Sequence, residues 1–395
     1  MKPSVPRILI DARGLQEGFK THNHRGIGHY ASNLIDGILD SNSSFQFIFL
    51  VEKGPAVDER LQNHPCIFQT PKWFEPAATR MISEQWTLPR TMPFTSFDLV
   101  HFLAHGDGTM YSRVPSVVSV MDTISLSVKE LYSPYQRLKH GIANSLTRRI
   151  LQHSRSIIAI SEHTKEDIIK YFAIPSEKIH VVPLAAEKRF FQKWAPSDLL
   201  RIRTRFELPE NFLLYVGGID PRKNVGIMFN ALKLLFEKDP AACPLLAFAG
   251  DIAHQREYPQ LMKSLHALGI GNRIRFLGYV PEKELPLLYQ ASTMFLFPSR
   301  YEGFGLPVLQ AMAAGTPVIT TKLSSIPEVA GDAALYIHPD NPVELARAIT
   351  EIFSNHALRS SLVASGMKRA GTFSWERTVN ETFEVYREAL MMQNK

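Results

Sequence analysis

The stretch FPSRYEGFGLPVLQAMAAGTP, residues 297–317, begins where a short apolar run, Met294–Phe297, comes to its end. That run predicts a buried strand. Pro307 suits the first position of a helix, and Gly315 suits the residue just after a helix end. Pro317–Thr321 then predicts a second strand. The order strand, loop, helix, strand is typical of a parallel α/β sheet.

The loop inside this stretch is a candidate ligand site, because ligands of open parallel sheets bind beyond the carboxyl ends of the strands. Backbone amides that enter the helix can bind oxygen atoms. Gln310 lies one turn into the helix, so its side chain leans back toward the loop and can hold one polar ligand together with Glu302. The alternative is a solvated turn acid and an ordinary helix amide. The loop residues concerned are Glu302, Gly303, Phe304, Gly305 and Leu306.

A second loop with ligand chemistry follows the apolar run Phe212–Val216. It reads GGIDPRKN over residues 217–224, and an apolar helix is predicted directly after it. Arg222 and Lys223 at a helix start suit a diphosphate, because the helix end and both cations favour negative charge. The alternative is a solvated basic turn. Together the two loops predict a site for a sugar joined to a diphosphate.

A glycine motif near the amino end, RGIGHY from Arg25 to Tyr30, completes a pattern that spans nearly the whole chain. With these motifs the chain resembles a retaining glycosyltransferase of family 4, and in particular bacterial mannosyltransferases of surface polysaccharides. The resemblance implies the α/β fold called GT-B. In that fold two doubly wound, Rossmann-like domains face each other across a cleft, and the last helix crosses back to the first domain.

The family signature is a Glu, seven residues and a second Glu. The resemblance implies that the first Glu, here Glu302, contacts the donor sugar, and that the second contacts the ribose hydroxyls. Gln310 stands at the second position, where an amide can still accept and donate hydrogen bonds without charge. Lys223 matches the phosphate-binding Lys of the family. Gly218 stands where many members have Arg, and we expect Arg222 to supply that guanidinium.

The site residues that we predict fall into three groups. Glu302, Lys223 and Arg222 are the expected catalytic residues, and Asp122 is expected on the acceptor side, in a VVSVMDT stretch where Met121 replaces a His common in relatives. Ser161 is interpreted as a helix cap. The expected donor-binding residues are Gly26, Gly28, Gly217, Gly218, Arg222, Lys223, Tyr279, Val280, Glu302, Gly303, Phe304, Gly305, Leu306 and Gln310.

Length and composition predict two domains. The 395 residues exceed the size at which single cores stop growing, and 45% hydrophobic with 21% charged residues is ordinary for a globular protein. We predict a first domain over 1–190 with the helix 374–395, a linker over 191–207 and a donor-binding domain over 208–373. The expected strands are residues 7–10, 45–51, 99–102, 117–120, 157–160 and 179–182, then 212–216, 245–248, 274–277, 294–297, 318–320 and 335–337.

Several classes of protein are disfavoured by the sequence. Cys66 and Cys243 lie in different predicted domains without metal-ligand spacing, so we expect neither a disulfide framework nor a zinc site. No metal ligand cluster or DxD sequence occurs near the predicted site, and we expect no metal or other cofactor. There is no run of 18 apolar residues and no signal-peptide core, so we expect a cytoplasmic protein.

The net charge of +6 suggests an anionic partner. The cations Arg137, Lys139, Arg148 and Arg149 are interleaved with apolar residues, which is typical of a helix on an anionic membrane surface. A nucleic acid is the competing partner, but no binding motif occurs, and we expect none. A solvated basic face is the other alternative. A lipid-linked acceptor would make peripheral binding to the inner face of the plasma membrane natural.

The expected function is transfer of a sugar from a nucleotide diphosphate to a hydroxyl of a glycan or lipid-linked glycan, with retention of the anomeric configuration implied by the resemblance. GDP-mannose is the expected donor, with UDP-sugars as the alternative. Two other functions remain open. One is a nucleotide-sugar-binding protein with little transfer activity, suggested by Gln310, Gly218 and Met121. The other is a different enzyme on the same fold, such as an epimerase or a phosphorylase.

Overall fold

The computed structural model describes residues 5–16, 26–53, 58–62, 64, 67–70, 77–92 and 96–391. The chain forms two compact units, Met1–Leu184 with Trp375–Lys395, and Ala185–Ser374. These boundaries differ from the predicted ones. The segment 191–207, predicted as a linker, belongs to the second unit and contains a helix, α7 (Pro196–Arg205), which packs on α10 (Leu285–Ala291).

The first unit is built on a parallel sheet. Within the described residues it has seven strands in the order β3-β2-β1-β4-β5-β6-β7. Leu9 and its neighbours in β1 are fully buried, as expected for a central strand that is covered on both faces. The strands are β1 (Arg7–Asp11), β2 (Gln46–Glu52), β3 (Ile67–Thr70), β4 (Leu99–Phe102), β5 (Ser116–Val120), β6 (Ser156–Ala159) and β7 (Ile179–Val181).

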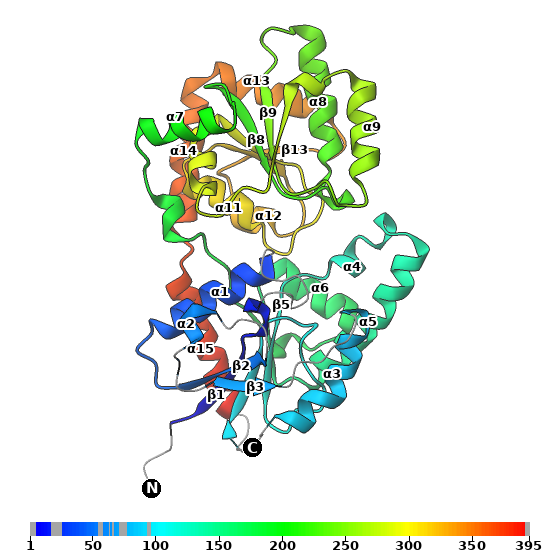
Figure 1. Cartoon of the computed structure of the whole chain (residues 1–395), viewed down its shortest axis with the longest axis vertical. Helices are drawn as coiled ribbons and strands as arrows, with labels where there is room; N and C mark the ends of the chain where they lie inside the picture. Colours follow the sequence, from blue (N-terminus) through cyan, green and yellow to red (C-terminus); the bar gives the residue numbers. More distant parts are fainter. Residues whose placement is uncertain are drawn as a thin grey trace. The chain divides into compact units, whose positions relative to one another are not determined.

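Helices cover both faces of this sheet (Figure 1). One face packs on α3 (Ala77–Thr91), α5 (Pro134–His153) and α6 (Glu162–Phe172), whose apolar side chains join the core of the unit. The other face packs on α15 (Trp375–Met391), which also contacts α1 (Gly26–Leu39). The short helices are α2 (Glu59–Gln62) and α4 (Ile124–Ser127). The prediction that the last helix returns to the first domain is therefore confirmed.

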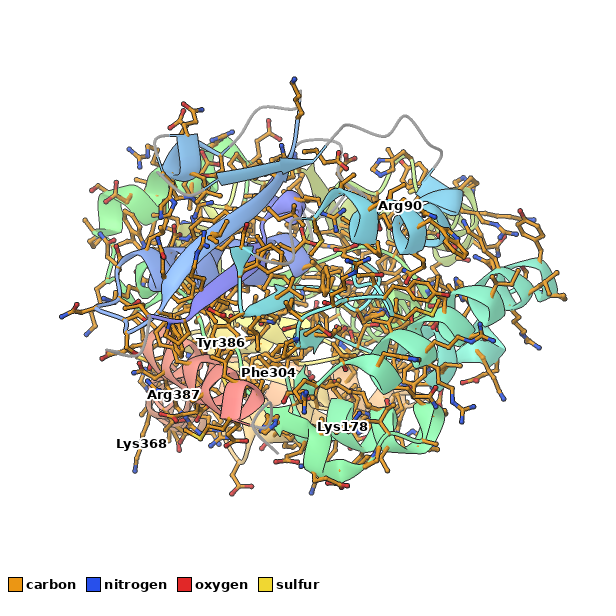
Figure 2. The ribbon with its side chains drawn as sticks, turned by 90° about the horizontal axis from the view of Figure 1, so that it is seen from below. Arg90, Lys178, Phe304, Lys368, Tyr386 and Arg387 are labelled. Atoms are coloured by element: carbon orange, nitrogen blue, oxygen red, sulfur yellow. The ribbon has the colours of Figure 1, made fainter. Side chains whose placement is uncertain are left out.

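A buried polar chain connects α15 to the sheet. His101 of β4 lies 2.7 Å from the Tyr386 hydroxyl through Nδ1 and 2.8 Å from the Ser119 hydroxyl through Nε2. Tyr30 of α1 completes the chain with a 2.8 Å hydrogen bond to Ser119. Tyr386 lies on α15 beside Arg387 (Figure 2). Burial lowers the pKa of His101 to about 3, so the imidazole is neutral in the folded state.

The second unit has a parallel sheet of six strands among its described residues, in the order β10-β9-β8-β11-β12-β13. This is the doubly wound order, in which the chain builds outward from β8 and then returns to build from β11 in the other direction. The strands are β8 (Phe212–Val216), β9 (Leu245–Ala249), β10 (Ile274–Gly278), β11 (Met294–Phe297), β12 (Val318–Thr321) and β13 (Leu335–Ile337).

Helices also cover both faces of the second sheet (Figure 1). The packed pairs are α8 with α13 and α9 on one side, and α11 with α14, α10 and α12 on the other. Their bounds are α8 (Val225–Lys238), α9 (Tyr258–Leu268), α11 (Leu306–Ala313), α12 (Ile326–Ala330), α13 (Pro342–Ser354) and α14 (His356–Ala370). Pro307 lies in the first turn of α11, and Gly315 follows the helix with a φ of +76°, as predicted.

The predicted strands agree with the structure to within one or two residues at their ends, and one strand is missed. β3 has only two strongly apolar residues, Ile67 and Phe68, so its sequence gives little periodicity. Of the cysteines, Cys243 is free and buried, and Cys66 lies outside the described residues. None of the helices in the described part of the chain has the length and apolarity that crossing a membrane requires.

Candidate functional site

The two predicted loops meet because of strand order. β8 and β11 are neighbours in the sheet, with Leu213 opposite Met294 and Leu214 opposite Phe295. They are also the strands at which the direction of winding reverses, and ligands of such sheets bind at this point, beyond the carboxyl ends. The loops that follow β8 and β11 therefore lie side by side, although Lys223 and Glu302 are 79 residues apart in sequence.

The loop after β8 has a fixed path. Gly217 has a φ of +153°, and a Cβ there would come within 2.9 Å of the Tyr215 hydroxyl, so the position requires glycine. That hydroxyl donates a 2.6 Å hydrogen bond to the carbonyl of Gly218. Asp220 accepts from the Arg222 amide at 3.1 Å and caps the short 3₁₀ helix η6 (Pro221–Lys223). This cap fixes the short helix from which Arg222 and Lys223 reach the loop that follows β11.

Gln255 occupies the space beside Gly218. A Cβ on Gly218 would lie 3.1 Å from Oε1 of Gln255, which accepts a 2.9 Å hydrogen bond from the Ile219 amide. Its Nε2 donates to the carbonyl of Asp251 at 3.0 Å. The amide thus connects the loops that follow β8 and β9. The side chain of Gln255 thus holds the loop after β8 from a neighbouring strand end.

An ion triad lies at the centre of the site. Lys223 Nζ lies 2.8 Å from Glu302 Oε1, and the Arg222 guanidinium lies 3.0 Å from the same oxygen. Arg222 also donates to the carbonyl of Tyr301 at 3.0 Å, and Lys223 Nζ lies 4.9 Å from the centre of the Phe297 ring. The three predicted catalytic residues are therefore in direct contact, with two cations facing one carboxylate.

Burial and charge act against each other in the triad. Burial alone would raise the pKa of Glu302, but the charges of Lys223 and Arg222 outweigh it and hold that pKa below its usual value. Burial lowers the pKa of Lys223 more than Glu302 raises it. Glu302 is therefore ionised at neutral pH. Asp220, 3.6 Å from the Arg222 guanidinium, is a second carboxylate beside the two basic side chains.

The Glu302 backbone is held at both of its polar groups. Its amide donates to the Ser324 hydroxyl at 2.9 Å, and its carbonyl accepts from the Ser325 hydroxyl at 2.9 Å. Two residues later Phe304 packs edge-on against Phe373, with ring centres 5.9 Å apart (Phe304 is labelled in Figure 2). Gly305 then enters α11 with a φ of +105°, which a residue with a side chain rarely adopts. Gly303 and Leu306 complete this short loop.

Gln310 lies one turn into α11 and is 7% exposed. Within the described part of the chain, its side-chain amide has no hydrogen-bond partner, whereas its backbone carbonyl accepts from the Ala314 amide at 3.0 Å.

Tyr279 and Val280 lie at the same edge of the sheet. The amide of Gly217 donates to the carbonyl of Ala249, and the amide of Gly250 donates to the carbonyl of Gly278, each at 2.9 Å, so the ends of β8, β9 and β10 are aligned. Tyr279 comes directly after β10 with 58% of its surface exposed, and Val280 is buried.

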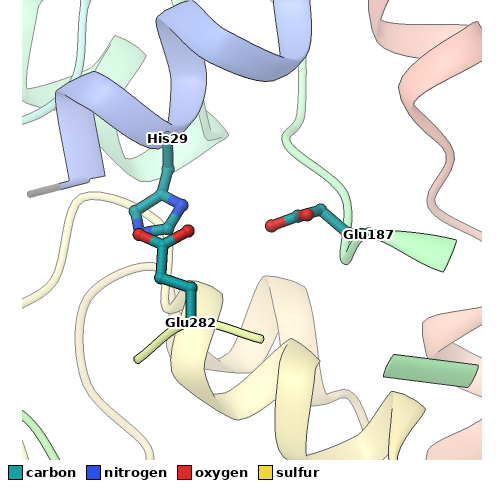
Figure 3. Close-up of side chains that lie close together, drawn as sticks. All are labelled: His29, Glu187 and Glu282. Carbon is teal, nitrogen blue, oxygen red and sulfur yellow. The ribbon is translucent and has the colours of Figure 1, made fainter. Parts of the chain in front are cut away.

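An ion cluster fixes the segment after Val280. Arg189 in η5 (Lys188–Phe191) lies 2.7 Å from Glu187 and 3.3 Å from Glu282. Figure 3 shows the carboxylates of Glu187 and Glu282. The start of the second unit is thereby bound to the loop that carries Tyr279 and Val280.

The remaining predicted residues lie in the first unit. Gly26 and Gly28 form the first turn of α1, while Arg25 of the same motif lies outside the described residues. Asp122 follows β5 and accepts from the Ile124 amide at 3.1 Å, so it helps to start α4. Ser161 caps α6 by accepting from the Thr164 amide at 3.0 Å, as predicted.

Sequence reasoning missed the residues that support the site, namely Tyr215, Gln255, Ser324 and Ser325. Each acts through a hydrogen bond to a loop backbone rather than through a recognisable motif. Ser324 has a φ of +52°, an unusual conformation for a residue other than glycine, but nothing in the local sequence announces it. Only the doubly wound strand order reveals that these side chains converge.

The fold and the arrangement of loops define a two-domain α/β protein of the GT-B class. Solved structures agree with this class. HepE of Anabaena, in complex with UDP and glucose, matches 97% of this chain and 99% of that chain with a TM-score of 0.73 and 18% identity. Sucrose-phosphate synthase from Thermosynechococcus elongatus matches 98% of this chain and 100% of that chain with a TM-score of 0.76 and 18% identity. At this level of identity the likeness concerns the fold.

The chain belongs to glycosyltransferase family 4. Residues 25–187 match the family described as Glycosyltransferase Family 4, and residues 197–369 match Glycosyl transferases group 1. The O-antigen chain mannosyltransferase B of Escherichia coli is 30% identical over 304 residues, which cover 76% of this chain and 77% of that protein. The serotype-specific mannosyltransferase WbdA of Escherichia coli is 26% identical over 71% of this chain, which matches only 35% of the longer relative. The protein is therefore a glycosyltransferase.

Proposed function

We propose that the protein transfers mannose from GDP-mannose to a hydroxyl of a glycan or lipid-linked glycan, with retention of the anomeric configuration. The observation that carries the proposal is the ion triad of Glu302, Lys223 and Arg222 at the reversal of the second sheet. Its two basic side chains lie beside backbone amides at a helix start, which suits the diphosphate of a nucleotide sugar. The mannosyltransferases among the relatives support the choice of sugar.

The leaving group sets the role of the two cations. As the bond between the anomeric carbon and the diphosphate oxygen breaks, negative charge grows on the diphosphate, and Lys223 and Arg222 stabilise it. Both cations also contact Glu302. Because two cations are already placed there, we propose that transfer requires no metal ion. Structures of relatives that hold UDP and glucose support a nucleotide diphosphate as the ligand of this class.

Glu302 and Gln310 would hold the two ends of the donor. Glu302 would orient the sugar, and the amides of Gly303 and Leu306 would bind its hydroxyls. Gln310 would bind the ribose. The acceptor hydroxyl would attack from the face of the leaving group, so that a new bond forms from its oxygen to the anomeric carbon and its proton passes to the departing phosphate. No side chain is proposed as a nucleophile.

The acceptor side rests on fewer observations. We propose Asp122 as an acceptor contact, since it follows the carboxyl end of β5 and is only partly buried. The basic helix α5 supports a lipid-linked acceptor at an anionic membrane surface, because it carries cations and no acid in its 20 residues.

The test is a transfer assay with defined donors. The purified protein is incubated with GDP-mannose, UDP-glucose or another nucleotide sugar and a lipid-linked glycan, in the presence and absence of EDTA, and the anomeric configuration of the product is determined by NMR. The proposal expects mannose transfer with retention that persists in EDTA. Loss of transfer in EDTA that manganese restores would refute metal independence, and an inverted product would refute the mechanism.

A protein that binds nucleotide sugars without transferring them is the second candidate. It is favoured by the two departures from the family pattern at the site, Gln310 and Gly218. Thermal-shift measurements with GDP, UDP and their sugars distinguish the two, since a ligand at about 100 times its dissociation constant adds roughly 2.7 kcal/mol to stability. Strong stabilisation by a nucleotide sugar without turnover on any acceptor would favour the binding protein. Release of a free sugar, or phosphate-dependent cleavage of a glycan, would instead indicate an epimerase or a phosphorylase.

A further inference from the structure

The first unit contains a surface groove that the proposed reaction does not use. It lies between α3 and α5 and has a volume of about 590 Å³, within the range of ligand sites. All of its lining residues belong to the first unit. One wall is formed by Trp86 of α3 and by Met110 and Tyr111, and the other wall is formed by α5.

The walls of the groove are apolar and exposed. Trp86 has 55% of its surface exposed, Leu138 70% and Ile142 59%. Leu138, Ile142 and Leu146 recur every four residues and therefore share one face of α5. Leu146 packs against the core, so the stripe continues from the interior of the unit to its surface. Contiguous exposed apolar side chains on a protein surface mark a site of interaction.

A glycine keeps the groove open. Gly141 lies in the middle of α5 and lines the groove, and a Cβ placed on it would meet no other atom within 4 Å. Glycine destabilises the interior of a helix relative to alanine, and here no close packing or positive φ requires it. The open space itself accounts for its presence, because any larger side chain at this position would project into the groove.

The ends of the groove are cationic. Arg137 and Arg149 line it, with Lys139 and Arg148 nearby on the same helix, and α5 contains no acidic residue. Arg90 does not line the groove, but its guanidinium lies 5.7 Å from the centre of the Trp86 ring, and Figure 2 shows Arg90 on α3. Arg137 is held by the carbonyls of Lys129 and Tyr132 at 2.9 Å each, whereas the Arg149 side chain makes no hydrogen bond or ion pair within the described part of the chain.

We propose that this groove binds the hydrocarbon chain of a phosphorylated lipid, with the phosphate at Arg149. An apolar floor with a cation at its end is complementary to an anionic head on a long apolar chain. It is not complementary to a nucleic acid, which would leave the apolar stripe in water. The inference rests on the proposed function in one respect, namely that the acceptor is lipid-linked. It goes further by assigning the lipid part of the acceptor to a defined site.

The test compares soluble probes of the two halves of such a lipid. Binding of farnesyl phosphate, farnesol and inorganic phosphate to the full chain is followed through the fluorescence of Trp86, with Trp86→Phe as the control that the signal arises there. We expect farnesyl phosphate to bind saturably and at least tenfold more tightly than either half alone. Equal binding of farnesol and farnesyl phosphate would overturn the role of Arg149, and no saturable binding of farnesyl phosphate would overturn the proposal.

Two variants locate the site. Gly141→Leu places a side chain in the groove at a position where a Cβ meets no other atom within 4 Å, and it should weaken farnesyl phosphate binding at least tenfold. Arg149→Ala should weaken it about fivefold, whereas Arg148→Ala removes the same charge from a neighbour that does not line the groove and should change affinity less than twofold. Circular dichroism verifies that each variant is folded. Equal losses from Arg149→Ala and Arg148→Ala, or unchanged binding by Gly141→Leu, would overturn the proposal in favour of adsorption by surface charge.

Failure of this inference is distinguishable from failure of the proposed function. GDP binding and transfer to a water-soluble glycan are measured on the same preparation of the parent protein, because the donor site lies in the second unit. If the parent protein binds GDP and transfers the sugar but does not bind farnesyl phosphate, the groove proposal alone fails. If farnesyl phosphate binds as described but no nucleotide sugar is used, the lipid site stands and the transferase proposal fails.

Discussion

One carboxylate oxygen of Glu302 contacts both Lys223 and Arg222. The contact holds both cations beside the loop that follows β11, and under the proposed function a diphosphate would compete with Glu302 for them. The geometry also accounts for why the two cations are adjacent in sequence. The cap that Asp220 provides for η6 fixes Arg222 and Lys223 together, so both can reach the same ligand.

The first prediction concerns the cations. Lys223→Ala and Arg222→Ala should each weaken GDP binding at least tenfold, because a hydrogen bond to a charged group contributes about 1.5 to 3 kcal/mol and each 1.4 kcal/mol is a factor of ten. The double variant should be weaker than either single one. Isothermal titration calorimetry measures the affinities. Adding Glu302→Gln to the double variant controls for the buried carboxylate that is left unpaired. If the double variant binds GDP within twofold of the parent affinity, neither cation binds the diphosphate.

The second prediction separates the two ends of the donor. Glu302→Gln should reduce kcat more than donor affinity, because the charge of Glu302 gains importance as the anomeric carbon becomes positive in the transition state. Gln310→Glu should be tolerated, since a carboxylate also accepts a hydrogen bond from ribose. Steady-state kinetics on both variants measure this split. If the Glu302→Gln variant has the kcat of the parent, Glu302 takes no part in the mechanism. If the Gln310→Glu variant no longer binds the donor, the assignment of Gln310 to the ribose is wrong.

At the scale of elements, the loops after β8, β9 and β11 lie at the same edge of the second sheet and are joined by side-chain contacts. Gln255 is the residue that joins the first two, and it does so in the space that a side chain at position 218 would otherwise occupy. The loop of this chain is thus stabilised from a neighbouring strand end.

The third prediction follows from this bond. Gln255→Ala should lower the free energy of unfolding by about 1 kcal/mol, because the Ile219 amide loses its acceptor. It should also raise KM for the donor more than it lowers kcat, since the loop that carries Arg222 is then less well fixed. Gln255→Glu retains the acceptor oxygen and is the matched control. If alanine and glutamate at position 255 give the same KM, the role in positioning the loop is wrong.

Much of the fold can be predicted from local sequence, but the side-chain hydrogen bonds that fix the loops of the site cannot. The strands were predictable because parallel strands buried on both faces are short apolar runs, as in Phe212–Val216. β3 was missed because only two of its residues are strongly apolar. The segment 191–207 was predicted as a linker from its mixed charge, but one face of α7 packs on α10. The partnership of Gln255 with Ile219 depends on strand order, which no local pattern encodes.

At the scale of the molecule, each unit has its own sheet and core, and the first unit is completed by the end of the chain. His101, Ser119, Tyr30 and Tyr386 form the buried polar contact between its sheet, α1 and α15. All four are fully buried in the folded state.

The fourth prediction is a pH dependence of stability. The pKa of His101 is about 3 in the folded state and about 6.5 when unfolded, so below pH 6.5 the unfolded state binds a proton that the folded state excludes. Stability is therefore complete above pH 6.5 and is lost as the pH falls from 6.5 toward 3, by up to about 1.4 kcal/mol per pH unit.

Denaturant unfolding between pH 7 and pH 4 measures this dependence. His101→Gln retains hydrogen-bonding groups but does not titrate, so its unfolding free energy should fall less steeply over the same range. Tyr386→Phe is a second variant, expected to lose about 1 to 3 kcal/mol at neutral pH because it leaves a buried ring nitrogen unpaired. Parallel pH profiles for the parent and His101→Gln would show that another group controls acid unfolding.

The position of α15 has a consequence for biosynthesis. The second unit is continuous in the chain, so all of it is synthesised before the last helix of the first unit. Until residues 375–391 emerge, the face of the first sheet that α15 covers has no partner from its own chain, even though that sheet was synthesised first. The unit that begins first is therefore completed last, and a premature stop before residue 375 would leave that face uncovered in a product dependent on chaperones.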